Sequence, residues 1–269
     1  IVDGRAITEA SGCITPETAP AIAAAEALIA HVPEEVLRME SPPMGDFLEG
    51  YLSHKQHVLI RFGKWREIIA QELPEDRELY CATTAMMFYA KGVAHSALGE
   101  IVQAEAMRAA FLEAKPRVAP RRRVHNNKVS DLLEIAEAML EGELEYRKGN
   151  YDVAFDHLRR SVALDDGLPY DEPWGWMQPT RHALGALLLE QGALEEAEAV
   201  YRADLGLDPT LARACQHHGN VWALTGLREC LERRGETVEI VHVRQRLEVA
   251  RARADVPVEV SCFCRRTAA

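Results

Sequence analysis

The sequence predicts an all-α fold built from helical hairpins. The pattern Gly-x6-Gly-x4-Ala begins at Gly92, Gly142 and Gly185, and three copies of one spacing are not expected by chance. Apolar residues flank each copy at the three- and four-residue intervals of an amphipathic helix. The chain has 269 residues, of which 48% are hydrophobic, so it can bury a sizeable core in one or two domains.

Each member of the repeated pattern has a physical role. We expect the first glycine to lie inside a helix, at a point where a neighbouring helix approaches closely. The second glycine ends that helix, because glycine adopts the left-handed conformation at a helix C-terminus without steric cost. The alanine then lies in the next helix, at the contact between the two helices.

In chain order, this reading predicts five helical hairpins. The first is "YLSHKQHVLIRFG" followed by "KWREIIAQEL", and the second is "MMFYAKGVAHSAL" followed by "IVQAEAMRAAFL". The third and fourth are "LLEIAEAMLEGELEYRKG" with "NYDVAFDHLRRSVAL", and "RHALGALLLEQG" with "ALEEAEAVYRADLGL". The fifth is "VWALTGLRECLERRG" followed by "ETVEIVHVRQRLEVARARA". Their turns are predicted at Gly63, Gly99, Gly149, Gly192 and Gly235.

The unit at 178–211 resembles the tetratricopeptide repeat, because it combines Leu184-Gly185, Ala197, Tyr201 and Pro209. The resemblance covers about residues 49–254. With "HVLIRFGKW", "AKGVAHSALG", "DEPWGWMQPTRHA" and "CQHHGNVWAL", the chain is similar to the C-terminal half of longer bacterial and fungal tetratricopeptide-domain proteins. The resemblance implies an α-solenoid of about five hairpins at 49–254. An N-terminal helical segment at 1–48 is expected to precede it, and an extended tail at 255–269 to follow it. The resemblance implies no catalytic residues.

The hairpins are spaced more widely than in a plain tetratricopeptide array. Successive turn glycines at positions 63, 99, 149, 192 and 235 are 36, 50, 43 and 43 residues apart, whereas a plain array repeats every 34 or so. The extra residues fall mainly between one hairpin and the next. In a solenoid, such connections emerge along one edge, so residues on the insertions should gather at one rim.

The leading functional hypothesis is a scaffold module that binds a protein or peptide. The segment "PYDEPWGWMQ" at 169–178 is rich in aromatic and acidic residues, and tryptophan, tyrosine and arginine are common binding anchors. The expected binding residues are Tyr146, Asp171, Glu172, Trp174, Trp176, Arg181 and His182. We predict that 169–178 is an ordered rim loop, with Trp174 or Trp176 beside His182. The alternative interpretation is that both tryptophans pack in the core between repeats.

The second hypothesis is a metal-binding protein or metalloenzyme with its site on the same rim. Imidazole, carboxylate and thiolate groups suit zinc, copper or iron. The expected ligands are His57, His182, His217, His218, Cys262 and Cys264. Against this, His217 and His218 could cap a helix beside Asn220, and the Cys262–Cys264 spacing is shorter than in most structural zinc sites. The sequence contains no Walker loop, nucleophile elbow or HExxH motif, so no cofactor is required by a motif.

Charge and composition narrow the class of partner. A net charge of -11 argues against nucleic-acid binding. The one dense basic run, Arg121 to Arg123, is expected in a solvated loop, or in contact with an anion. No apolar stretch is long enough for a membrane span. Six cysteines, mostly isolated in helical patterns, favour a reducing compartment, and we expect the cytoplasm. The chain opens on Ile1, which suggests a fragment or trimmed product, and an uncapped first repeat would favour a homodimer or a missing segment.

Overall fold

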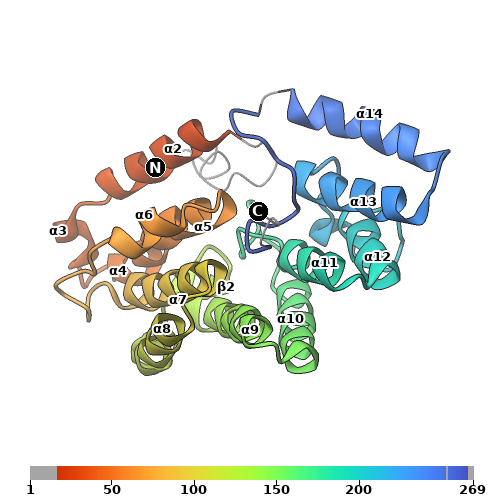
Figure 1. Ribbon diagram of the computed structural model, residues 1–269. Coiled ribbons are helices and arrows are strands. Elements are labelled where there is room, and N and C mark those ends of the chain that lie inside the picture. Colours follow the sequence, from red (N-terminus) through yellow and green to blue (C-terminus); the bar gives the residue numbers. More distant parts are fainter. Residues whose placement is uncertain (1–16, 253, 266–269) are drawn as a thin grey trace. The chain divides into compact units, whose positions relative to one another are not determined.

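The computed structural model describes residues 17–252 and 254–265, and these residues are predominantly helical (Figure 1). Within these ranges the only strands are β1 (Arg123–Val124) and β2 (Asn127–Lys128), which form an antiparallel two-stranded hairpin. The all-α class predicted from the sequence is therefore confirmed. No helix in this part of the chain combines the length and apolar character that would let it cross a membrane.

Short helices precede the first hairpin, and longer helices follow in pairs. In chain order the α-helices are α2 (Thr18–Ala30), α3 (Glu34–Leu37), α4 (Met44–Leu48), α5 (His54–Arg61), α6 (Trp65–Ala70), α7 (Cys81–Leu98), α8 (Ile101–Ala114), α9 (Val129–Lys148), α10 (Tyr151–Asp166), α11 (Thr180–Gln191), α12 (Leu194–Asp204), α13 (Val221–Arg234) and α14 (Glu239–Arg251). The short 3₁₀ helices are η1 (Glu49–Ser53), η2 (Lys115–Arg117) and η3 (Arg213–Cys215).

Each of the five predicted turn glycines lies between two helices, as the sequence analysis expected. The pairs are α5–α6, α7–α8, α9–α10, α11–α12 and α13–α14. All five glycines have positive φ angles, between 63° and 87°. A side chain in this left-handed region would crowd the backbone, which explains why glycine occupies every one of these turns.

The chain divides into two compact units. Among the described residues, the first unit comprises 20–177 and the second comprises 17–19 with 178–252 and 254–265. The boundaries predicted at 48/49 and 254/255 stay predictions. Residues 1–16 of the predicted N-terminal segment and 266–269 of the predicted tail lie outside the described residues.

In the first unit, the close helix contacts occur at the predicted glycines. A Cβ atom on Gly92 of α7 would lie 2.7 Å from Leu140 of α9, and one on Gly142 of α9 would lie 2.6 Å from Leu158 of α10. Ala104 and Ala154, the alanines of the pattern, are completely buried. The small residues are therefore needed because a larger side chain would force the packed helices apart.

In the second unit, one tyrosine packs against two glycines. Tyr201 of α12 is completely buried, and its ring touches Gly185 of α11 and Gly226 of α13, where a Cβ atom would overlap the ring. Ala197, one turn earlier on α12, is also completely buried. The repeated glycine spacing thus creates the slot that accepts an aromatic ring between helices.

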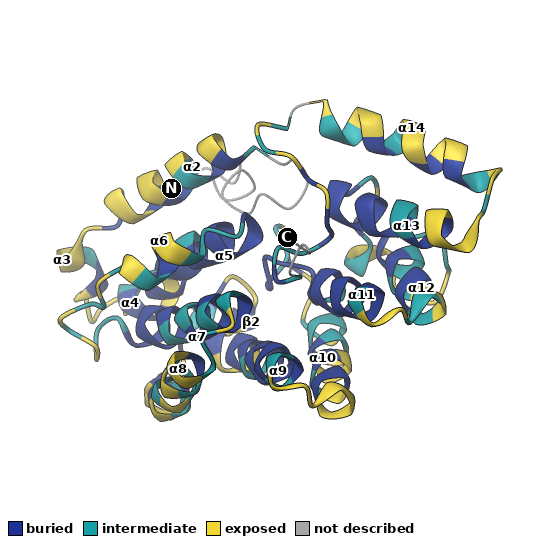
Figure 2. Ribbon diagram, viewed as in Figure 1, coloured by how far each residue is buried: buried dark blue, intermediate teal, exposed yellow. Residues whose placement is uncertain are grey.

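Within each of the last four hairpins, the first helix is more buried than the second. Figure 2 shows α7, α9, α11 and α13 largely buried, whereas α8 and α14 carry long exposed stripes. The cause is visible in the packing of α7, which contacts α5, α6, α8 and α9. Polar residues on a first helix therefore lie inside the unit, where each needs a partner.

Candidate functional site

The segment that follows α10 is held in the first unit by a buried carboxylate. Asp171 accepts hydrogen bonds from the backbone N–H of Asn126 (3.1 Å) and from Nδ2 of Asn127 (3.0 Å), and lies 3.4 Å from His125 Nδ1. These three partners belong to the β1–β2 hairpin, in the longest insertion. The carboxylate thus joins two insertions.

The two tryptophans of this segment have different surroundings. Trp176 is 1% exposed, and its ring meets His57 edge-on at a centroid distance of 4.8 Å and Tyr89 at 5.7 Å. Trp174 is half-buried, and the neighbouring Glu172 is exposed and accepts a hydrogen bond from the Tyr170 hydroxyl. Trp176 is therefore an interior residue of the first unit. The predicted neighbour His182 belongs to the second unit, so that pairing stays a prediction.

Polar residues recur at fixed positions on the first helices of the hairpins. His57, Glu143 and Glu229 each lie six residues before a turn glycine, at 63, 149 and 235, whereas Tyr89 and His182 lie ten before theirs, at 99 and 192. Because six and ten differ by about one helical turn, these positions share one face. We call this face the inner face of each unit. In the first unit it carries His57 on α5, Tyr89 on α7 and Glu143 on α9, and the Trp176 ring packs against His57 and Tyr89.

Several polar atoms on this face of the first unit are buried without hydrogen-bond partners. They are the indole Nε1 of Trp176, the hydroxyl of Tyr89 and both ring nitrogens of the adjacent His54. An unsatisfied buried donor or acceptor costs about 1–3 kcal/mol. Such atoms are rare in folded proteins, so each needs an explanation, and a bound ligand is one such explanation.

Burial also shifts the pKa values of the ionisable groups here. It raises the pKa of Glu143 to about 8, against a smaller lowering effect from the Arg147 charge. It lowers the pKa of His54 to about 4 and that of His57 to about 3. The carboxyl group is therefore mostly protonated, and both imidazoles are neutral, at pH 7. In this state Glu143, His54 and His57 contribute little charge to the inner face of the first unit.

The second unit contains a buried carboxylate between two histidines. Asp204 Oδ2 lies 2.9 Å from His182 Nε2, and Asp204 Oδ1 lies 2.8 Å from His217 Nδ1. Burial alone would raise the pKa of Asp204, but the charges and hydrogen bonds of His182 and His217 hold this pKa below its ordinary value. Two predicted metal ligands are thus brought together by an aspartate that the sequence analysis did not select.

The remaining predicted ligands have other environments. His218 Nδ1 faces the carbonyl oxygen of Leu205 at 3.0 Å, and Asn220 rather than a histidine caps α13, accepting from the backbone N–H groups of Trp222 and Ala223. Cys262 and Cys264 form a disulfide, so in this state neither offers a thiolate. His57 belongs to the first unit. Within the described ranges, no group of three or more histidine, cysteine or acidic side chains has a geometry suited to a metal ion.

A non-helical segment after α14 packs against the inner face of the second unit. The Tyr201 hydroxyl lies 2.5 Å from Ser261 Oγ, which donates to the carbonyl oxygen of His182 at 3.2 Å. The Phe263 ring meets Trp222 edge-on at 5.5 Å, and Arg265 Nη1 donates to Glu229 Oε2 at 2.6 Å. We call residues 258–265 the docked segment. Hydrogen-bonding, aromatic and charged contacts together hold it on α11, α12 and α13.

Two other predicted binding residues lie at packing positions. Tyr146 is buried, and its ring meets Tyr151 edge-on at 5.0 Å and Phe155 at 6.0 Å, so it joins the two helices of its own hairpin. Arg181 is half-buried in the first turn of α11. Sequence spacing cannot separate such packing contacts from groove contacts, because both occur on helical faces.

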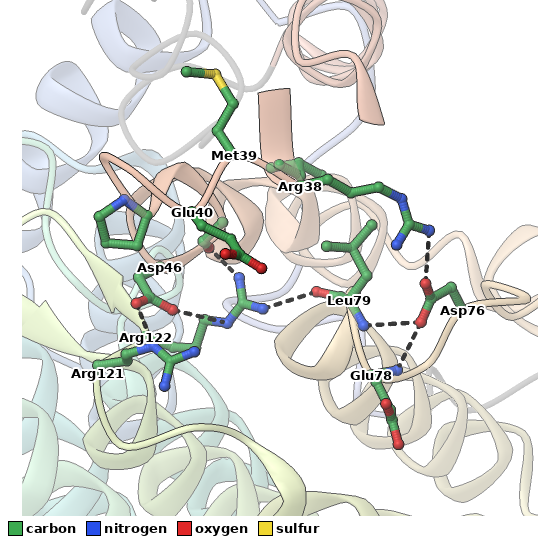
Figure 3. A pocket seen from close by; sticks show the side chains of 12 residues that line it. Arg38, Met39, Glu40, Asp46, Asp76, Glu78, Leu79, Arg121 and Arg122 are labelled. Carbon is green, nitrogen blue, oxygen red and sulfur yellow. Dashed lines mark hydrogen bonds and ion pairs between the residues drawn. The ribbon is translucent and has the colours of Figure 1, made fainter. Parts of the chain in front are cut away.

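The basic run Arg121 to Arg123 was expected in a solvated loop, and for Arg122 this is wrong. Arg122 is 7% exposed and donates to the carbonyl oxygens of Gly45 and Leu79. Arg121 pairs with Asp46. Figure 3 shows these groups, together with the Arg38–Asp76 pair, lining a pocket of about 860 Å³ in the first unit. Each of these arginines has a partner within the protein. Ion pairs and hydrogen bonds between the lining residues therefore stabilise the pocket.

The fold and these contacts define an all-α protein of helical hairpins with polar residues on the buried face of its first helices. No protein-family model matches the chain, and neither a curated protein nor a solved structure matches it.

Proposed function

We propose that the protein is a helical-repeat module, of the tetratricopeptide type, that binds a short peptide segment of a partner protein. The observation that carries the proposal is the docked segment at 258–265. In the second unit, the inner face already holds a piece of non-helical chain through specific side-chain contacts.

The contacts indicate the chemistry that such a partner presents. Serine, aromatic and basic side chains occupy positions 261, 263 and 265 of the docked segment, and each meets a different group of the inner face. A partner segment with a hydroxyl, an aromatic ring and a basic side chain in this order would satisfy the same groups. The net charge of -11 supports a basic partner, because opposite charges speed association.

The proposal extends to the architecture and setting predicted from the sequence. The hairpins stack as a solenoid, the protein acts in the cytoplasm, and a homodimer is one arrangement that would cover an exposed terminal repeat. Size-exclusion chromatography with light scattering tests the dimer separately. Binding of a partner peptide does not depend on its outcome.

The central test measures binding of the docked segment in trans. The full chain carrying Phe263→Ala and Arg265→Glu has a weakened internal contact, and a labelled, oxidised peptide of residues 256–265 is titrated into it by fluorescence anisotropy. We expect saturable binding, at least about tenfold tighter than to the unsubstituted chain, whose own segment competes.

Charge reversal on the inner face provides the specificity control. Added to the same background, Glu229→Lys should abolish binding, because Glu229 receives the arginine, whereas Glu248→Lys on the exposed side of α14 should leave it unchanged. Absence of saturable binding, or equal effects of the two lysine substitutions, would refute the proposal. Metal binding, the other function predicted from the sequence, stays a prediction, and elemental mass spectrometry of the untagged protein tests it.

A further inference from the structure

We infer that the inner face of the first unit binds the cationic group of a basic ligand, with Trp176 and Tyr89 as its aromatic neighbours and with the Glu143 carboxyl group, which releases its proton to solvent when the cation binds, as its anionic partner. The inference deepens the proposed function and rests on it for the use of the inner face as a binding surface. It concerns a different unit and different residues, so its test is independent.

The carboxyl group of Glu143 is buried on the inner face of the first unit. Glu143 is 4% exposed and makes no hydrogen bond or ion pair with the described residues. The nearby cation on its own helix, Arg147, stacks over the Tyr146 ring at 5.2 Å. Glu229 occupies the same position relative to its turn glycine and holds Arg265 at 2.6 Å. Both units therefore carry a glutamate six residues before a turn glycine. In the second unit this glutamate pairs with an arginine, and in the first unit it does not.

Two aromatic rings lie against one another on the same face. The Trp176 and Tyr89 rings are 5.7 Å apart between centroids and tilted by 61°, and both residues are essentially inaccessible to solvent. Tryptophan and tyrosine faces attract ammonium and guanidinium groups, most strongly when water is excluded. Tyr89 and Glu143 lie on the contacting helices α7 and α9, and the pKa of Tyr89 is raised by burial and, to a smaller extent, by Glu143. A cation near Glu143 would therefore lie close to an aromatic ring.

Both rings also carry hydrogen-bond donors that are buried without acceptors. The indole N–H of Trp176 and the hydroxyl of Tyr89 have no protein acceptor. An amide carbonyl beside the cationic side chain of a ligand would accept from either group. An apolar ligand would leave both donors unsatisfied. A cationic, amide-bearing ligand fits all of the groups together.

The ligand chemistry is that of an arginine or lysine side chain, from either a small amine or a basic peptide. Binding of Nα-acetyl-arginine amide to the full chain is measured by isothermal titration calorimetry, with Nα-acetyl-citrulline amide as the uncharged isostere. We expect the arginine probe to bind at least about tenfold more tightly than the citrulline probe. Agmatine, which lacks the amide, and acetyl-Gly-Arg-Gly-amide then separate the two sources, since only the peptide-like probe uses the Trp176 and Tyr89 donors.

Substitutions assign the site. Glu143→Gln keeps the volume and removes the carboxyl group that ionises when the cation binds, and should weaken the arginine probe at least about tenfold, with an unchanged circular dichroism spectrum. Glu145→Gln, two residues along α9 and paired with Lys148 near the surface, should leave affinity unchanged. Trp176→Phe keeps a ring but removes the indole donor, and should weaken acetyl-Gly-Arg-Gly-amide more than agmatine.

Each contrary result has a definite meaning. No saturable binding of any probe, or equal affinity for the arginine and citrulline probes, would show that water alone occupies the site and would overturn the inference. If Glu229→Lys removes probe binding while Glu143→Gln does not, the probe binds the second unit. The inference then fails and the proposed function stands.

Discussion

The two units differ in what meets the inner face of their first helices. In the second unit, Trp222 and Glu229 on α13 contact Phe263 and Arg265 of the docked segment, and Tyr201 on the second helix α12 contacts Ser261. In the first unit, Trp176, Tyr89 and Glu143 occupy the inner face, and the polar atoms of these three side chains have no hydrogen-bond partner among the described residues. Side chains on the inner face of the second unit therefore contact another segment of the chain. In the first unit, the polar atoms of the corresponding side chains are left without such contacts.

This difference separates stability from function. Every satisfied contact in the second unit should add to the free energy of unfolding, whereas the unsatisfied groups of the first unit should subtract from it. Proteins depart from complete satisfaction mainly where a site is reserved for a ligand. Removing polar groups should therefore have opposite effects in the two units. Asp204→Ala, Glu143→Gln and Glu229→Gln examine this contrast, and two further substitutions examine packing and turn conformation.

The largest effect is expected for Asp204→Ala in the second unit. The substitution removes the acceptor shared by His182 and His217 and leaves two buried imidazoles without it. We expect a loss of about 3–5 kcal/mol in the free energy of unfolding, measured by urea denaturation. Glu195→Ala, at an exposed position on the same helix, should change stability by less than about 0.5 kcal/mol. A loss below about 1 kcal/mol for Asp204→Ala would mean that the network is not a cohesive element.

The opposite sign is expected for Glu143→Gln in the first unit. The pKa of this group is about 8 in the folded state and near 4.3 in the unfolded chain. Between these values the folded protein holds a proton that the unfolded chain has released, so the stability of the natural protein falls as pH rises and levels off above pH 8. Glutamine does not titrate, and the variant should be more stable by about 2–4 kcal/mol at pH 9, with little gain at pH 4.5.

The matched control for that pH dependence is Glu229→Gln in the second unit. Glu229 is already paired with Arg265, so its substitution removes a satisfied contact and should give a small loss of stability, opposite in sign to the gain expected for Glu143→Gln. Urea denaturation of both variants between pH 4.5 and 9 makes the comparison. Parallel pH profiles for the two variants would contradict the distinction between a satisfied and an unsatisfied inner face.

A smaller effect is expected where α12 packs against its neighbours. Ala197 is completely buried one turn from Tyr201, so Ala197→Leu should overpack the contact and cost about 1–3 kcal/mol. Thermal unfolding followed by circular dichroism would measure it. An unchanged thermal unfolding midpoint would show that the core beside Tyr201 has room for the larger side chain. That result would contradict the tight packing described above.

The smallest effect is expected at a turn. Gly149 has a φ angle of 87° and open space around its Cα, so Gly149→Ala meets no atoms but places a side chain in the left-handed region. The cost should be about 1 kcal/mol by urea denaturation. Gly167, where φ is -85°, is the control, and Gly167→Ala should cost less. A larger loss at Gly167 would mean that turn conformation does not set the requirement for glycine at 149.

The helical pattern could be predicted because it depends on local physics. Glycine is needed where φ is positive or where helices touch, and both requirements leave a fixed spacing, as at Gly142 and Gly149. His182 and His217 could be selected by residue type. Asp204 could not, because an acidic residue at the end of a helix has no distinctive sequence signal. The burial of Arg122 was equally hidden, since its partners are backbone carbonyl groups distant in sequence.

The segment at 258–265 has a further consequence as a tethered competitor. It is joined to α14 by a few residues, so its local concentration at the second unit is on the order of millimolar, whatever the amount of protein present. The proposed peptide partner would have to outcompete this internal copy, and its apparent affinity would be reduced by the fraction of time that the segment is bound. The tether thus sets a threshold that rejects weak partners. Lengthening the connection at 252–257 would lower this threshold without changing one contact on the inner face.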